Sequence, residues 1–158
     1  MIRELSFATQ LGRLRLGWSP GGICLLRFAE PLGPGEAATA PAWVHDAVRR
    51  LMAHLNGQPQ DLRDLPLDLS DLTPFQRRVA DVLRATLPGQ TLTYGDVALL
   101  AGRPGAARAV GQAVKANPIL ILVPCHRVVA ASGPGGWSAF GTPERKARLL
   151  ALEDPKAC

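Results

Sequence analysis

Cysteine is scarce in this sequence, and the few cysteines present form no pattern. Only three occur in 158 residues, namely Cys24, Cys125 and Cys158. Their number is odd, they lie far apart and none belongs to a CxxC pair, so the sequence lacks both a disulfide scaffold and the usual closely spaced zinc site. Cys24, His45 and His54 together would make a poor set of zinc ligands. We therefore expect free thiols, no bound metal and no cofactor.

Long apolar runs are also missing. No stretch of about eighteen apolar residues exists, and the start, MIRELSFATQ, carries Arg3 and Glu4 with no apolar segment of signal-peptide length after them. With 47% hydrophobic and 20% charged residues, the chain is apolar enough to bury a core in one large domain or two small ones. We expect a cytoplasmic protein that does not bind membranes.

Acidic residues are scarce in the second part of the chain. Residues 1–68 hold seven basic and seven acidic residues, whereas residues 69–158 hold eleven basic and six acidic ones. The whole net charge of +5 therefore lies after residue 68. A basic excess in one segment is typical of proteins that bind a phosphate backbone, although a solvated basic surface produces the same pattern.

Short apolar segments separated by turns fill the first thirty residues. ELSFATQ and RLRLGW alternate in part and GICLLRF is more continuously apolar, which predicts a meander of three strands. Residues 31–41 contain so much Pro, Gly and Ala that we expect a loop. The helical spacing of apolar residues from Trp43 to Leu55 predicts an amphipathic helix. DLPLDL, residues 64–69, returns as a short strand or an extended linker.

Two helices with strong start signals are predicted after residue 72. Thr73 is a suitable N-cap and Pro74 a suitable first residue for a helix that runs to residue 87. Thr93 can cap a second helix, from Tyr94 to about residue 101.

A third helix is predicted over residues 106–117, after a turn rich in Gly and Pro. Together with the preceding helix it makes a helix-turn-helix pattern, and it carries Arg108 and Lys115. Helical bundles that bind no nucleic acid contain the same geometry, so the pattern alone leaves both alternatives open.

Cys125 lies in the heptapeptide VPCHRVV, inside an otherwise apolar run. Pro124 keeps the residue before it out of the α conformation and so predicts a bend at the cysteine. His126 and Arg127 would be costly to bury without partners and could favour a thiolate, which indicates an activated nucleophile. A buried structural cysteine is the alternative, because adjacent side chains of an extended segment point to opposite sides and need not meet.

The segment NPILILVPCHRVV resembles the active-site segment of the O6-alkylguanine-DNA alkyltransferases, also called methylated-DNA–protein-cysteine methyltransferases. The resemblance extends over TPFQRRVADVLRATLPGQTLTYGDVALLAG, AARAVGQAVKANP and GGWSAFGTPERKARLLALE, in that family's order from residue 73 to 153. It implies an α+β fold whose residues 1–68 form a small sheet-and-helix domain, ribonuclease-H-like in the family. Residues 69–158 would form a mainly helical, winged-helix-like domain that contains the helix-turn-helix and the active site.

The resemblance also implies a reaction. Cys125 would accept the alkyl group of O6-alkylguanine in DNA, with O4-alkylthymine as a second candidate substrate, in a single-turnover suicide reaction that repairs the base directly. His126 would take the thiol proton through a bridging water, and Glu153 would orient the imidazole. Asn117 would hold the bend around the thiol, a role compatible with that of an ordinary turn residue. Tyr94 would donate a proton or hydrogen bond to the departing guanine, unless it is only a core aromatic.

DNA contacts are implied for the second helix of the helix-turn-helix. The helix would lie in the minor groove, and Arg108 would fill the gap that remains when the damaged nucleotide is flipped out of the duplex. The alternative for Arg108 is a solvated charge on the helix surface. Small neighbours would permit close approach to the DNA backbone, or would only help the helix pack. The further DNA-binding residues would be Ala107, Ala109, Gly111 and Lys115. The wall of the base pocket would consist of Tyr94, Val128, Trp137 and Ser138.

Two positions depart from the family pattern. Ala80 stands where tryptophan is common, which predicts looser packing there or compensation elsewhere, and Trp137 stands where tyrosine or phenylalanine is common.

Two rival classes of protein fit less well. A cysteine hydrolase would need a histidine remote in sequence and an oxyanion pocket, and nothing in the sequence marks either. A DNA sensor would bind alkylated DNA without reacting, but the relatives that do so have the cysteine replaced, and Cys125 is present. We therefore expect a monomeric alkyltransferase that repairs double-stranded DNA.

Overall fold

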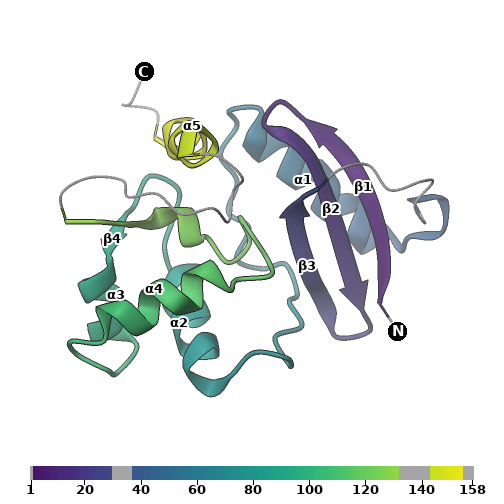
Figure 1. Ribbon diagram of the computed structural model, residues 1–158. Coiled ribbons are helices and arrows are strands. Elements are labelled where there is room, and N and C mark those ends of the chain that lie inside the picture. The colour runs from purple at the N-terminus through teal and green to yellow at the C-terminus, as the bar shows by residue number, and fades with distance from the viewer. Residues whose placement is uncertain (1, 30–36, 132–142, 155–158) are drawn as a thin grey trace.

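The computed structural model describes residues 2–29, 37–131 and 143–154. It has a mixed α/β architecture in which a small antiparallel sheet and helix α1 (Ala42–Leu55) form one side and the other helices lie beside them (Figure 1). Within these residues there are five α-helices, and none is long and apolar enough to cross a membrane.

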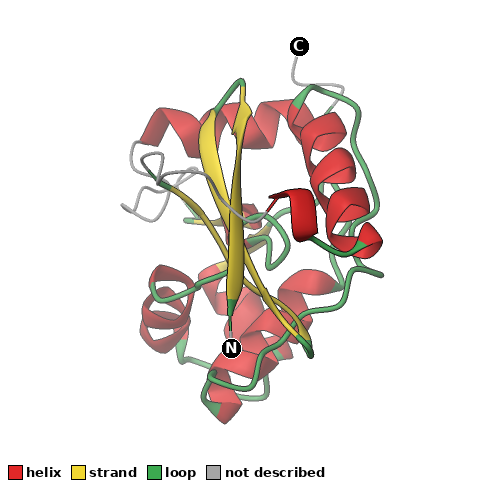
Figure 2. Cartoon of the chain, turned by 90° about the vertical axis from the view of Figure 1, so that its right-hand side faces the viewer, coloured by secondary structure: helices red, strands yellow, loops and turns green. Residues whose placement is uncertain are grey.

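Three strands form the sheet in the order in which they occur in the chain: β1 (Arg3–Thr9), β2 (Gly12–Ser19) and β3 (Gly22–Phe28). All neighbouring pairs are antiparallel, which confirms the predicted meander (Figure 2). Leu14 and Leu16 on the central strand are fully buried, because alternate residues of a strand face the same side.

Helix α1 confirms the predicted amphipathic helix, and its buried apolar residues belong to the hydrophobic core: Val44, Ala47, Leu51 and Leu55. The predicted loop over residues 31–41 needs one correction. Ala37–Thr39 form a short 3-10 helix, η1, whereas residues 30–36 lie outside the described part of the chain.

The free edge of β3 pairs with two segments that are distant in sequence. Ile23 exchanges two backbone hydrogen bonds, of 2.9 and 2.8 Å, with the segment 66–68, so this part of DLPLDL is an extended linker that touches the sheet. Leu26 exchanges two further bonds, of 2.9 and 2.8 Å, with the segment 118–120. An edge strand is thereby covered, and the segment that leads to Cys125 is fixed to the sheet.

The three helices predicted between residues 73 and 117 are present as α2 (Pro74–Arg84), α3 (Tyr94–Leu100) and α4 (Ala107–Lys115). Thr73 and Thr93 are the N-caps of α2 and α3, and each forms a capping box that satisfies a backbone N–H at the helix start.

Helix α2 ends at Arg84, three residues earlier than predicted. The hydroxyl of Thr86 donates to the carbonyl of Leu83 at 2.6 Å, which caps the last turn. Pro88 disfavours the α conformation at the residue before it, so the helix cannot continue to residue 87.

Two further features of this half were not predicted from the residue pattern. Strands β4 (Leu92–Thr93) and β5 (Val128–Val129) form a short parallel pair directly before α3 and directly after the 3-10 helix η2 (Cys125–Arg127). Helix α5 (Pro143–Glu153) closes the described part of the chain. The β4–β5 pair fixes the start of α3 to the segment that carries Cys125.

Candidate active site

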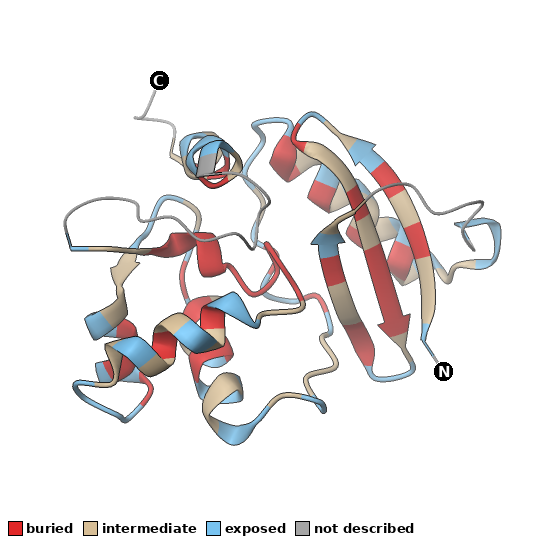
Figure 3. Ribbon diagram, viewed as in Figure 1, coloured by how far each residue is buried: buried red, intermediate tan, exposed pale blue. Residues whose placement is uncertain are grey.

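The segment 119–128 is buried along its whole length and leads from α4 into β5 (Figure 3). Two three-residue turns bend it. Ile121 has a φ of 72°, and the N–H of Leu122 donates to the carbonyl of Leu120 at 2.8 Å, which makes a γ-turn of the rare positive-φ form. Pro124 has φ −78° and ψ 66°, values typical of the inverse γ-turn. The bend predicted from Pro124 is therefore present, but the turn at Ile121 was not foreseen.

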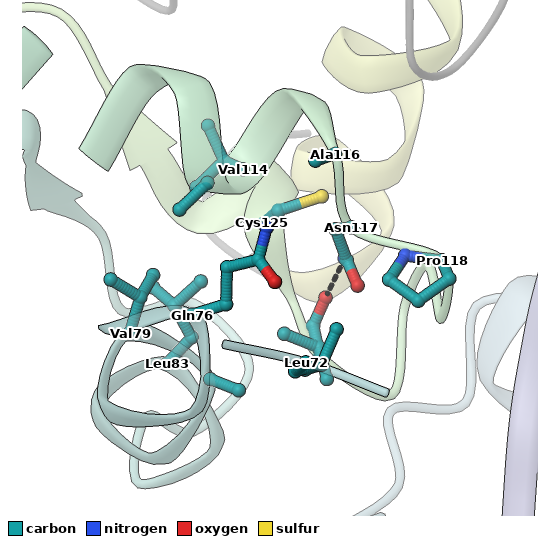
Figure 4. Close-up of a pocket in the computed structure, with 12 residues that line it drawn as sticks. Leu72, Gln76, Val79, Leu83, Val114, Ala116, Asn117, Pro118 and Cys125 are labelled. Carbon is teal, nitrogen blue, oxygen red and sulfur yellow. Dashed lines mark hydrogen bonds between the residues drawn. The ribbon is translucent and has the colours of Figure 1, made fainter. Parts of the chain in front are cut away.

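A positive φ is strained for a β-branched residue, by about 1–3 kcal/mol, and surrounding structure must hold it. Asn117 supplies part of that hold. Its side-chain amide donates to the carbonyl of Val123 at 2.9 Å, and its carbonyl oxygen accepts from the N–H of Ile119 at 3.0 Å (Figure 4). Asn117 thus ties together the two ends of the bend that precedes Cys125.

Cys125 is fully buried, and burial raises the pKa of its thiol to about 11 although Asn117 and Lys146 act to lower it. The side chains that lower this pKa are Asn117 and Lys146, not His126 or Arg127. Both lie against Glu153 instead, as described below. About one molecule in ten thousand would carry the thiolate at pH 7. The thiol is therefore mainly protonated at neutral pH, and a base that takes its proton would favour attack.

Lys146 on α5 is the cation beside this thiol, and its side chain is 2% exposed. Its Nζ donates to the carbonyl of Val128 at 2.8 Å. Burial lowers the pKa of Lys146 to about 8, and the neighbouring Cys125 acts in the opposite direction. Sequence reasoning missed Lys146, because a lysine in the pattern PERKARLL resembles any surface charge of a helix.

The pH dependence of thiol reactivity follows from this burial. We expect iodoacetamide to alkylate Cys125 in the folded protein at a rate that rises about tenfold per pH unit to about pH 10, because the thiolate is the reacting form. Peptide mass spectrometry after short exposures measures the rate. In urea-unfolded protein the alkylation rate of the same cysteine should stop rising near pH 9, because the thiol pKa is then in its ordinary range. A native rate that is already constant at about pH 8 would contradict this assignment.

Glu153 is the centre of the polar network behind the cysteine. Its Oε1 accepts from Nε2 of His126 at 2.7 Å and from Nε of Arg127 at 3.0 Å. Its Oε2 accepts from Nε2 of His54 at 2.7 Å and from Nη2 of Arg127 at 2.8 Å. All four residues are at most 5% exposed. The predicted neighbours His126 and Glu153 do meet, and His54 joins them although sequence reasoning considered it only as a poor zinc ligand.

The charges of this network favour an ionised carboxylate and a neutral imidazole. Burial alone would raise the pKa of Glu153, but His126, His54 and Arg127 together lower it below its usual range. Burial lowers the pKa of His126, against the opposite effect of Glu153. A neutral His126 whose Nε2–H is bonded to Glu153 has Nδ1 as its basic nitrogen, which is the atom that could accept a proton.

Tyr94 is the first residue of α3 and is partly buried. The pairing of Thr93 with Val129 places it beside the segment of Cys125. Burial, together with the charge that Cys125 can carry, raises the pKa of Tyr94. The phenol therefore keeps its proton at neutral pH and can donate it.

Helix α4 packs through Val110 and Val114, which are buried, and exposes Arg108 and Lys115. Ala107, Ala109 and Gly111 are partly exposed. A Cβ built on Gly111 would meet no atom within 4 Å, so the protein's own packing does not require glycine there.

A small apolar cavity borders Cys125 on the side of α2 and of the carboxyl end of α4 (Figure 4). Ala80 is 2% exposed and lines this cavity, together with Val79, Val114 and Pro118. Some space thus remains near the position where tryptophan is common. Val128 of the expected base pocket is buried, whereas Trp137, Ser138 and Cys158 lie outside the described residues. Cys24 and Cys125 are free thiols, as expected.

Comparisons with known proteins identify the family. Residues 74–155 match the family model described as the DNA-binding domain of 6-O-methylguanine DNA methyltransferase. A methylated-DNA–protein-cysteine methyltransferase of Mycolicibacterium paratuberculosis is 48% identical over 97% of this chain and 93% of its own. The crystal structure of the Mycobacterium tuberculosis O6-methylguanine methyltransferase superposes with a TM-score of 0.82 at 36% identity, over all of this chain and 96% of its own. A structure of that organism's OGT in complex with DNA has a TM-score of 0.78 at 38% identity, over 96% and 92% of the two chains.

Proposed function

The chain belongs to the family of methylated-DNA–protein-cysteine methyltransferases, which act in DNA repair by alkyl transfer, and from that premise we propose that Cys125 is the alkyl acceptor. One observation carries this assignment. Cys125 is fully buried at a strained bend, next to a histidine whose Nε2 is bound to a buried carboxylate. Of the two cysteines that the structure describes, only this one has a lysine among the groups that act on its pKa.

The proposed step is a displacement at carbon. The Cys125 sulfur attacks the alkyl carbon on O6 of guanine, a carbon–sulfur bond forms and the carbon–oxygen bond breaks. The electron pair stays with the guanine, which receives a proton from Tyr94, so that the base does not leave as an anion. A thioether does not hydrolyse in water at neutral pH, so each protein molecule reacts once. O4-alkylthymine is a second candidate substrate.

The thiol proton goes to His126, through a bridging water that reaches Nδ1. Glu153 holds the ring by its other nitrogen and stabilises the imidazolium that forms. Because burial raises the thiol pKa to about 11, a base that removes the proton favours attack on the bound base. Lys146 beside the sulfur supports this, since a cation there lowers the cost of the developing thiolate.

The DNA surface is proposed to be α4, which would lie in the minor groove of double-stranded DNA. Arg108 would enter the stack in place of the flipped nucleotide. The open space at Gly111 supports a close approach of the backbone at Ala107, Ala109 and Gly111. Lys115 would add a phosphate contact, and Tyr94, Val128, Trp137 and Ser138 would form the base pocket.

The finer features of the fold remain predictions. These are a ribonuclease-H-like domain over residues 1–68, a winged-helix-like domain over residues 69–158, a monomeric state and a location in the cytoplasm. The backbone bonds between Leu26 and the segment 118–120 bear on the domain boundary, because they would have to break if the two parts separated.

Two substitutions separate the proposed roles of α3 and α4. Arg108→Ala should slow repair of duplex DNA by about tenfold or more, but should leave reaction with free O6-benzylguanine nearly unchanged, because the free base needs no flipping. Tyr94→Phe should slow both reactions, because the leaving guanine needs a proton in either case. Single-turnover rates on both substrates measure this.

Binding of undamaged duplex by the Arg108→Ala variant should fall only modestly, since one charge among several is lost. Equal losses of rate on duplex and on free base would contradict the proposed role of Arg108 and indicate that it is only a charge on the helix surface.

A further inference from the structure

Helix α1 contributes a buried polar side chain to the network behind Cys125. His54, in its last turn, is 1% exposed, and its Nε2 lies 2.7 Å from Oε2 of Glu153. The two residues are 99 positions apart in the sequence. The match to the family model begins at residue 74, so His54 lies outside it.

His54 can only donate a hydrogen bond to Glu153. The backbone N–H of Gln60 donates to Nδ1 of His54 at 2.9 Å, so Nδ1 carries no hydrogen and the hydrogen lies on Nε2. A ring whose second nitrogen accepts from a backbone N–H has no position from which to pass a proton onward. This excludes a relay through His54 and leaves a role in holding the carboxylate.

The two oxygens of Glu153 are distinguished by the two histidines. Arg127 donates to both oxygens, and this bidentate pair fixes the carboxylate on one side. His126 bonds only Oε1 and His54 bonds only Oε2. A rotation of the carboxylate that releases Oε2 from His54 also carries Oε1 away from His126.

We propose that His54 is a positioning residue for alkyl transfer. By holding Oε2 of Glu153, it fixes Oε1 of the same carboxylate against Nε2 of His126. The inference rests on the proposed roles of Cys125 and His126, and it adds to them a contribution from α1. The amino-terminal part of the chain then does more than support the fold, because it takes part in orienting the base that removes the thiol proton.

Three variants test the hydrogen bond separately from the packing. His54→Phe keeps a ring but has no donor, and we expect the plateau of the single-turnover rate on a duplex with O6-methylguanine to fall about tenfold or more. His54→Gln can place an amide N–H near the same point and should stay within about threefold of the wild type. His45→Phe changes an exposed histidine of the same helix and should have no effect.

The pH profile gives a readout that packing alone would not move. Among the described residues, the titratable and charged groups around His126 and the thiol are Cys125 and Arg127 on η2, Glu153 and Lys146 on α5, Tyr94 on α3 and His54 on α1. Burial lowers the pKa of His126, and Glu153 acts against that decrease. A loosened Glu153 lowers it further, so the acid limb of the profile should lie at lower pH for His54→Phe than for His54→Gln. Neither variant has an ionisable ring at position 54, so the difference between their pH profiles reports only the hydrogen bond to Oε2 of Glu153.

A second arm needs no DNA. The single-turnover rate with free O6-benzylguanine should be lower for His54→Phe than for His54→Gln, because His126 removes the thiol proton in that reaction too. Wild-type protein that takes no methyl from DNA would refute the proposed function, whereas equal rates of these two variants in both arms would overturn the positioning role alone. His54→Leu replaces the phenylalanine variant if that does not fold. If neither folds, the glutamine variant decides: a rate near that of the wild type supports the bond, and a tenfold loss overturns it.

Discussion

Cys125→Ser and Cys125→Ala should abolish alkyl transfer and leave binding of duplex DNA within about twofold of the wild type. The sulfur is the acceptor atom, and a serine hydroxyl at this buried position is a far weaker nucleophile. The proposed binding surface lies on α4, where Arg108 and Lys115 are exposed, and it does not include the thiol. Transfer of labelled methyl from a duplex to the protein, and a gel-shift titration, measure the two properties.

Cys24→Ala is the matched control for this result. Cys24 is partly exposed on β3, and it has no histidine or lysine among the groups that shift its pKa. Its replacement should leave transfer unchanged. Transfer by the Cys125→Ala variant, or an inactive Cys24→Ala variant, would show that the acceptor has been assigned to the wrong residue.

Glu153→Gln should lower the free energy of unfolding by about 3–5 kcal/mol, the cost of breaking a buried ion pair by removing one partner. The substitution leaves the guanidinium of Arg127 buried without its carboxylate. It also replaces one of the two oxygens that accept from His126 and His54 with an NH2 donor and removes the negative charge, so transfer should slow about 100-fold or more in protein that is still folded. Urea unfolding and single-turnover rates measure these two effects.

Glu144→Gln serves as the control, because Glu144 is exposed on the same helix and its loss should change stability by at most about 0.5 kcal/mol. The pKa of Glu153 is lowered in the folded state, so its ionised form stabilises the fold above the ordinary carboxyl pKa, about 4.3. That contribution is lost as the pH falls below this value. The stability difference between wild type and Glu153→Gln should therefore narrow in acid, and a difference that stays constant from neutral pH down to about pH 3 would contradict the ionised network.

Local signals in the sequence predicted most of the regular structure, because such signals act over a few residues. The threonine caps of α2 and α3 bond to N–H groups three positions away, and the alternation of the first strands needs only their own residues. The predicted end of α2 lies too late in the sequence. The hydroxyl of Thr86 caps the last turn by bonding to the carbonyl of Leu83, and the apolar pattern does not reveal such a bond.

The active site could be predicted only in part, because its contacts join distant parts of the chain. The resemblance to a family brought His126 and Glu153 together, and their side chains do form a 2.7 Å hydrogen bond. Nothing local marks His54 or Lys146, whose partners depend on how α5 packs against α1 and against the segment after Cys125. The γ-turn at Ile121 is equally invisible, because isoleucine disfavours a positive φ and only the tertiary structure imposes it.

The central claim, that Cys125 receives the alkyl group, is tested most directly by mass spectrometry of the wild-type protein after mixing with a duplex that holds one O6-methylguanine. The account predicts that each protein molecule gains the mass of a single methyl group, in step with the loss of the lesion, and that peptide mapping places it on Cys125. Repeated turnover without a mass gain, binding without loss of the lesion, or a methyl group on another residue would contradict it.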